Sequence, residues 1–267
     1  MLKTMQDTPK RLVIRLAQNT LSVSTVNADA TVDFLPYVVR SGISMAANMR
    51  EAFKNEAILQ KAYDKTVVMV ESPVLMVPAD LYEEEEAESM YAHAYSDIRT
   101  SAVMTNVLPD LSAVALFAIN KDLKMVITDH IPTARFICAV APVWRYLHRR
   151  SFTGARSKLY GYFHDKRLDV FSFNQHRFKF CNSFDAANAH DSLYYLLYVW
   201  KQLMLKPEYD EMHIVGDIPE REWIMDELKR YLQRAYCINP SGDFNRSPIA
   251  QIKGMPYDLM TYLIKGR

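Results

Sequence analysis

The chain has 267 residues, of which 49% are hydrophobic and 24% are charged, a composition typical of a globular protein with a substantial core. Its 32 Lys and Arg residues almost balance its 31 Asp and Glu residues, and the net charge of +1 gives no overall attraction to nucleic acid or to an anionic membrane. The length suits one large domain or two subdomains of ordinary size.

The cysteines and the N-terminal stretch indicate the compartment. Cys138, Cys181 and Cys237 are far apart and form no Cys-x-x-Cys pair. This pattern disfavours a disulfide framework or a structural zinc site and predicts a cytoplasmic protein. The N-terminus has no apolar signal-peptide core, and no run reaches about 18 apolar residues, so we expect no leader and no membrane span.

The first half of the chain predicts a β-hairpin followed by mixed strands and helices. Residues 12–16 and 21–26 are rich in strand-forming side chains and flank a turn at 18–20. A third strand follows at 32–39, and its proline predicts an edge position or a bulge. The remaining predicted elements are a helix at 45–62 capped by Ser44, one or two strands at 66–78, a helix at 79–95, a hairpin at 112–129 around Asn120, and a helix at 133–150 kinked near Pro142.

The polar, basic stretch at 149–158 predicts a boundary between a first subdomain, 1–150, and a second, 151–267. Beyond it the pattern of elements restarts. The predicted elements are a hairpin of 159–163 and 168–173, a strand at 176–181, a long buried helix at 185–205, a strand at 211–216, a helix at 219–235, a short strand at 236–240 and a helix at 256–265.

The two hairpins are similar in length and in apolar pattern. At one constant offset Leu12 falls on Leu159, and Leu21 falls on Leu168. Each hairpin is followed by a third strand, a helix, a strand, a helix and a strand. This order predicts a duplicated α/β fold, with an unduplicated mixed α/β enzyme as the alternative.

The order of elements resembles the superfamily of actin, heat-shock chaperones and sugar kinases. Within that superfamily the whole chain resembles an uncharacterised bacterial family with an actin-like ATPase fold. The resemblance implies two actin-like (ribonuclease H-like) subdomains, each a mixed sheet with flanking helices. It also implies a cleft between them, which holds ATP in other members.

The phosphate-binding motifs that this resemblance implies are degenerate. The first runs from a strand into Asp-x-Gly, where the carboxylate orients Mg²⁺ and the glycine lets backbone amides meet phosphate. Arg15 and Ala17 stand at these two positions. The second motif falls on 162–164, which is Tyr-Phe-His. The chain has only 7 glycines, and Gly42 alone precedes Gly154.

The third motif, a strand running into Gly-Gly beside the adenosine, matches Gly216 but not Asp217. The resemblance therefore implies Gly216, Asp217 and Arg15 as cofactor-binding positions in the cleft. Each has a structural alternative. Gly216 can form a tight strand-to-helix turn with Asp217 as the helix cap, and Arg15 can be an exposed surface arginine.

Two polar clusters lie outside these motifs. His164, Asp165 and Asp169 surround the second hairpin turn, but they lack the spacing of metal ligands and indicate a polar turn. A basic patch at the boundary could meet nucleic acid or an acidic partner, or could be a flexible linker; it comprises Arg149, Arg150, Arg156 and Lys158. The aromatic helix at 194–200 is predicted to belong to the core.

These patterns favour a non-catalytic, actin-like protein that acts in protein–protein interaction or scaffolding. We expect no catalytic residue and no metal, because phosphoryl transfer depends on metal placement and charge neutralisation. The alternative is a divergent ATP-binding protein, an ATPase or kinase, whose ligands come from residues such as Asp165 or Asp217. Binding of RNA or DNA through the basic patch is a third, less favoured possibility.

Overall fold

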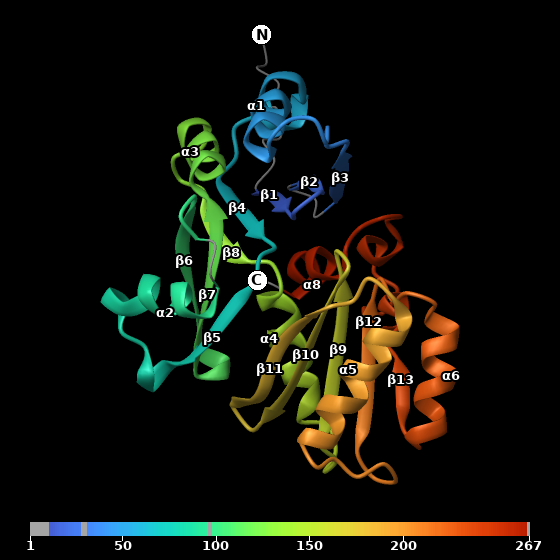
Figure 1. Cartoon of the computed structure of the whole chain (residues 1–267). Coiled ribbons are helices and arrows are strands. Elements are labelled where there is room, and N and C mark those ends of the chain that lie inside the picture. The colour runs from blue at the N-terminus through green and yellow to red at the C-terminus, as the bar shows by residue number, and fades with distance from the viewer. Residues whose placement is uncertain (1–10, 28–30, 96–97, 266–267) are drawn as a thin grey trace. The chain divides into compact units, whose positions relative to one another are not determined.

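A computed structural model describes residues 11–27, 31–95 and 98–265 of the chain (Figure 1). Its contacts divide the chain into two compact units, Met1–Val107 with Val114–Ala141, and Leu108–Ala113 with Pro142–Arg267. The subdomain boundary between residues 150 and 151 stays a prediction. The N-terminal stretch that we expected to carry no leader falls outside the described residues.

The first unit is built around a five-stranded sheet in the order β3-β2-β1-β4-β8. The hairpin strands β1, β2 and β3 are antiparallel, whereas β1, β4 and β8 run parallel. Its elements in chain order are β1 (Arg11–Leu16), β2 (Leu21–Val26), β3 (Val32–Tyr37), α1 (Met45–Asn55), β4 (Lys65–Val70), β5 (Val74–Pro78), α2 (Ala87–Ala94), β6 (Ser101–Leu108), β7 (Ala113–Asn120), α3 (Lys121–His130) and β8 (Arg135–Cys138).

A second, three-stranded sheet with the order β5-β7-β6 lies between β4 and β8 in the chain. Helix α2 covers it with Tyr91, which is 2% exposed and packs with Val77 and Leu116. The Tyr91 hydroxyl also donates a hydrogen bond of 2.8 Å to the carbonyl oxygen of Pro73. This inserted sheet has a small core of its own, and the sequence did not predict it.

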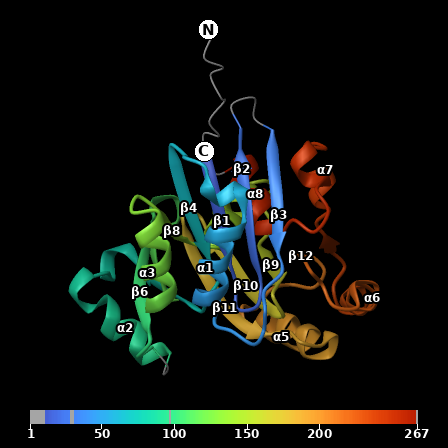
Figure 2. The ribbon, with the colours of Figure 1, turned by 90° about the horizontal axis from the view of Figure 1, so that it is seen from above.

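The second unit repeats the five-stranded sheet in the order β11-β10-β9-β12-β13 (Figure 1). Helix α5 packs against α6 (Figure 2) and against strands β10 and β11. The elements are α4 (Ala141–Ser151), β9 (Lys158–His164), β10 (Arg167–Asn174), β11 (Arg177–Asp185), α5 (Ala189–Gln202), β12 (Glu211–Gly216), α6 (Arg221–Tyr231), β13 (Ala235–Cys237), α7 (Pro240–Asp243) and α8 (Tyr257–Lys265).

The strand registers confirm the duplication residue by residue. Leu16 at the end of β1 pairs with Leu21 of β2 and with Val70 of β4. At the same offset, Phe163 of β9 pairs with Leu168 of β10 and with Gly216 of β12. Because order, strand direction and register all recur, the fold is two copies of one mixed sheet flanked by helices.

Successive side chains of β9 point to opposite faces of the second sheet. Gly161 lies under α5, where a Cβ atom would be 2.9 Å from Cδ2 of Leu196, so the glycine allows the helix to pack closely. On the other face the ring of Tyr162 lies 6.0 Å from that of Tyr257 in α8. The hairpin of the second unit therefore carries the side chains of Tyr162 and its alternate neighbours toward α8.

Two predicted elements around β7 and β8 are wrong in type. The expected hairpin at 112–129 is strand β7 followed directly by helix α3. Asn120 does not make a turn between strands; its side chain accepts a hydrogen bond from the amide of Leu123 and caps the helix. The expected helix at 133–150 is strand β8 followed by α4, and Pro142 stands in the first turn of α4, where proline is tolerated.

The predicted helices at 79–95 and 185–205 are shorter than expected. The first contains α2 only from Ala87, after two short 3₁₀ turns. The second begins as α5 after Asn188, which caps it by accepting a hydrogen bond from the Asp191 amide at 2.8 Å. Helix α5 is also not wholly buried, since Tyr194 is 61% exposed and Tyr198 is 46% exposed.

Candidate functional site

The first hairpin turn is closed by its own backbone and side chains. Arg15 is only 2% exposed, which contradicts the expected surface arginine, and its Nη1 donates to Oγ1 of Thr20 at 3.4 Å. The Ala17 amide donates to the Thr20 carbonyl oxygen at 2.9 Å, and the Leu16 carbonyl oxygen accepts from the Glu71 amide at 2.8 Å. The backbone amide at the glycine position of the phosphate motif is therefore already bonded within the turn.

The second hairpin turn holds a buried His–Asp pair. The imidazole Nε2 of His164 lies 3.0 Å from Oδ2 of Asp169, and both residues are 6% exposed. The Nδ1 atom of the same ring lies 3.6 Å from Oδ2 of Asp165. The ring of Tyr162 stacks on His164 with 4.5 Å between centroids. The structure thus brings together the polar residues that the sequence placed around this turn.

These two turns do not fit a Mg-nucleotide in the way that the superfamily resemblance implies. Register places Arg15 and Tyr162 at the two carboxylate positions, and they are 2% and 1% exposed. Neither a guanidinium nor a phenol supplies the anionic oxygen that Mg²⁺ prefers. The two glycine positions are occupied by Ala17 and His164.

A steric constraint that is independent of any ligand explains why residue 216 is a glycine. Its φ is +101°, and an added Cβ would lie 1.9 Å from the carbonyl oxygen of Phe163. The same carbonyl oxygen accepts a hydrogen bond from the Asp217 amide at 2.9 Å. The predicted role of Asp217 as helix cap is wrong, because the N-cap residue of α6 is Glu220 and it makes no side-chain cap hydrogen bond.

A pocket of about 580 Å³ opens beside Gly216, within the second unit. Its lining comprises a face of α6 and the chain from Cys237 to Pro240, which starts at the end of the last strand of the sheet. Of the three predicted cofactor positions, Gly216 lines this pocket. Asp217 follows Gly216 but does not line it, and Arg15 belongs to the first unit.

Charged side chains of α6 line much of the pocket, together with a thiol. The α6 residues are Arg221, Glu222, Met225, Asp226 and Lys229. Burial raises the pKa of the Cys237 thiol, and the charge of Arg221 acts in the opposite direction. Arg221 and Cys237 both line this pocket.

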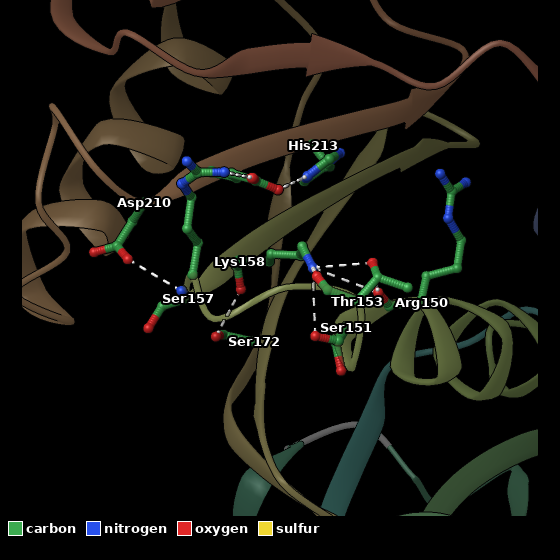
Figure 3. A network of polar contacts seen from close by, with 10 residues as sticks. Arg150, Ser151, Thr153, Ser157, Lys158, Ser172, Asp210 and His213 are labelled. Carbon is green, nitrogen blue, oxygen red and sulfur yellow. Dashed lines mark hydrogen bonds and ion pairs between the residues drawn. The ribbon is translucent and has the colours of Figure 1, made fainter.

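The basic stretch between the predicted subdomains is an ordered network rather than a flexible linker (Figure 3). Lys158 is 7% exposed, and its Nζ donates to carbonyl oxygens at the C-terminal end of α4, those of Arg150 at 3.5 Å and Ser151 at 3.4 Å, and to that of Thr153. Burial lowers the pKa of Lys158, although Glu211 opposes this shift. A cation placed at a helix C-terminus also stabilises the helix dipole.

The three arginines of the basic patch are each paired with a carboxylate of the second unit. Arg149 lies 3.6 Å from Asp110, Arg156 lies 3.4 Å from Glu211, and Arg150 pairs with Asp243. A nucleic acid would have to compete with these ion pairs. The patch therefore offers a phosphate backbone much less positive charge than its sequence indicated.

The repeated sheets define an actin-like ATPase fold, and solved structures agree. A Bacteroides thetaiotaomicron VPI-5482 protein with actin-like ATPase fold and unknown function superposes with a TM-score of 0.83 and 29% identity, over 92% of this chain and 98% of that one. A chain of the PilM-PilN type IV pilus biogenesis complex superposes with a TM-score of 0.54 and 12% identity, over 96% and 97%.

The chain belongs to the family described as Protein of unknown function (DUF3822), whose model matches residues 1–234. Comparison with curated proteins gives no match. The predicted fold and family resemblance are thereby confirmed. In the described part of the chain no helix is long and apolar enough to cross a membrane.

Proposed function

We propose that this protein is a non-catalytic member of the actin-like fold that acts by binding a protein partner. The observation that carries the proposal is the pair of buried side chains, Arg15 and Tyr162, at the two positions where the resemblance implies carboxylates. Phosphoryl transfer needs metal placement and charge neutralisation, and these residues support neither.

Two further observations support this proposal. The chain similar to this one at a TM-score of 0.54 was solved within a complex of two proteins, PilM and PilN, so the fold accommodates a protein partner there. At each hairpin turn, polar groups are bonded to the protein itself. The Ala17 amide donates to the Thr20 carbonyl oxygen in the first turn, and His164 pairs with Asp169 at the second. We also propose a cytoplasmic location, because Cys138, Cys181 and Cys237 are widely spaced and odd in number.

Thermal unfolding with and without 1 mM Mg-ATP tests the proposal, with phosphate release measured in parallel. A ligand present at about 100 times its Kd stabilises a fold by about 2.7 kcal/mol, which raises Tm by several degrees for a unit of this size. We expect no shift beyond that of Mg²⁺ alone and no phosphate release above the blank. A clear Mg-ATP shift contradicts the proposal and supports the alternative of a divergent ATP-binding protein.

The same assay on Asp217→Ala separates the two readings further. If ATP shifts the Tm of the natural chain and the variant loses that shift, Asp217 supplies a ligand as the alternative holds. If ATP raises the Tm of the natural chain and of Asp217→Ala equally, the nucleotide binds at a site that does not depend on Asp217. An actin-like protein with intact phosphate motifs serves as the positive control.

A further inference from the structure

The pocket beside Gly216 has an unusual arrangement of charge along α6. Arg221, Met225 and Lys229 follow each other at intervals of four residues and form one stripe that lines the pocket. Residues four apart lie above one another on a helix face. The stripe therefore presents a cation, an apolar side chain and a second cation, with about 12 Å between its ends at the helical rise.

A second stripe of opposite charge runs beside the first. Glu222 and Asp226, also four residues apart, line the same pocket. Among the described residues, none of these four charged side chains forms an ion pair or side-chain hydrogen bond. Among the α6 residues that do not line the pocket, by contrast, Arg230 pairs with Glu227 at 2.7 Å.

This balance of charge disfavours a polyanion as the occupant. A nucleotide triphosphate would meet two carboxylates together with the two cations, and the like charges would offset the gain. A ligand that carries both signs in the right order complements both stripes. We propose that this pocket holds an extended segment of a partner protein with the pattern acid–base–apolar–base–acid, an inference that rests on the proposed binding of a protein partner.

The spacing of an extended chain matches the first stripe. Side chains at positions one, three and five of a strand point to one side, and the distance from position one to position five is about 13 Å. The two acids would therefore face Arg221 and Lys229 while the apolar side chain packs on Met225. Side chains at positions two and four start out on the other side of the strand. Only long basic side chains there can turn back along the peptide and reach Glu222 and Asp226. Arginine is well suited to this role because its guanidinium binds a carboxylate through two hydrogen bonds.

The thiol of Cys237, which also lines the pocket, allows a direct test with short peptides. The probes are Glu-Lys-Leu-Lys-Glu and Lys-Glu-Leu-Glu-Lys. They have the same composition and net charge, but the acidic and basic positions are exchanged. Each carries a cysteine at one end as a mixed disulfide with cysteamine. The Cys237 thiolate displaces cysteamine and forms a mixed disulfide with the peptide, so bound peptide is trapped at this position.

The measurement is the labelled fraction of the full chain by intact mass at a fixed thiol concentration, with the site confirmed by peptide mapping. The background chain carries Cys181→Ser, and Cys237→Ser gives the unspecific level. We expect Glu-Lys-Leu-Lys-Glu to label Cys237 more than Lys-Glu-Leu-Glu-Lys does. Equal labelling by the two peptides, or stronger labelling by an adenosine disulfide of the same linker, overturns the proposal.

Matched variants of α6 locate the interaction. Arg221→Gln or Lys229→Gln should lower the labelling by Glu-Lys-Leu-Lys-Glu by up to about fivefold each, the upper range for one exposed ion pair. Arg230→Gln removes the same charge from the same helix outside the pocket and should leave labelling unchanged. The double variant Arg221→Glu with Lys229→Glu leaves four carboxylates in the pocket and should abolish the preference between the two peptides. An unchanged preference in that variant also overturns the proposal.

The outcomes separate this inference from the proposed function. A chain that shows no Mg-ATP shift and no peptide preference loses only the assignment of the pocket. A chain that shows a Mg-ATP shift but keeps the peptide preference loses only the claim that nucleotide chemistry is absent.

Discussion

The two hairpin turns occupy equivalent positions in the two units but are closed differently. In the second unit, Asp165 and Lys166 have φ values of +45° and +62°, the backbone of a tight turn with both central residues left-handed. Gln18 and Asn19 at the equivalent positions of the first unit have no positive φ. Beneath these turns, one unit has an arginine bonded to a threonine and the other has a His–Asp pair.

This difference shows that the scaffold tolerates unrelated turn chemistry. Strand order and register are the same in both units, while the backbone of the turn and the side chains under it are not. Neither turn keeps the carboxylate and glycine that the resemblance implies. The two units therefore share an architecture, whereas the function has to be inferred from the residues at each site.

The largest effect is expected from Gly216→Ala in the second unit. The equivalent position of the first unit holds Val70, so a side chain is accommodated there, whereas position 216 has no room for one. An alanine at φ +101° would place its Cβ against the Phe163 carbonyl oxygen. We expect a loss of about 3 kcal/mol or more in the free energy of unfolding of the second unit. Urea unfolding followed by tryptophan fluorescence measures it, since Trp144, Trp200 and Trp223 all lie in that unit.

Gly242→Ala is the matched control for this variant. No atom lies within 4 Å of a Cβ built at Gly242, and its φ is not in the left-handed region. The substitution should change the free energy of unfolding by at most about 1 kcal/mol. Similar losses in the two variants would refute the steric role of Gly216.

An intermediate effect is expected from breaking the side-chain pair under each turn. Asp169→Ala leaves Nε2 of a 6% exposed His164 without its partner at 3.0 Å, at a cost of about 2 kcal/mol. Thr20→Val removes the hydroxyl that accepts the long 3.4 Å hydrogen bond from Arg15 and should cost about 0.5 kcal/mol.

Amide hydrogen exchange of the peptides that contain each hairpin measures both variants in their own unit. Faster exchange should be confined to the hairpin that carries the substitution. Equal costs for the two substitutions would mean that the His–Asp pair adds no more to stability than the long Arg–Thr contact.

The smallest effect is expected from pH, through a histidine of the second unit. Burial lowers the pKa of His213 from its ordinary 6.5, although Glu211 opposes the shift. Between the lowered pKa and 6.5 the unfolded chain binds more protons, so stability falls as pH decreases through 6.5. Val67 holds the equivalent position in the first unit and does not titrate.

His213→Phe keeps a ring between Tyr160 and Tyr236, which stack on the histidine at 5.5 and 5.2 Å. The free energy of unfolding from tryptophan fluorescence should depend less on pH between 7 and 5 in this variant than in the natural chain. The same pH dependence in both chains would assign the effect to another group.

The sequence predicted those parts of the fold that rest on the alternation of apolar residues. The two hairpins, the duplication and the terminal helix at 256–265 follow from local pattern and are confirmed. The helix α3 was missed because Asn120 and its neighbours give the same local signal for a hairpin turn and for a helix cap. The choice depends on packing across the sheet, which a single sequence does not show.

The candidate site was predictable only in part. The replacement of the motif carboxylates by Arg15 and Tyr162 could be inferred from the aligned hairpins, but the burial of Arg15 could not. Gly216 was found through the resemblance, whereas its contact with Phe163 depends on the approach of two strands distant in sequence. The charge stripes of α6 are visible as four-residue spacing, and only the fold shows that they line a pocket.

The inserted sheet of the first unit has a consequence for the order of folding. Between the parallel neighbours β4 and β8 the chain runs from Val70 to Arg135, whereas between β12 and β13 it runs only from Gly216 to Ala235. This roughly threefold longer loop costs about 1 kcal/mol more in closure entropy before the strands can pair. Local contacts also form faster than distant ones. We therefore expect the second sheet to complete its last strand first during refolding, and the first sheet to be the slower half of the molecule.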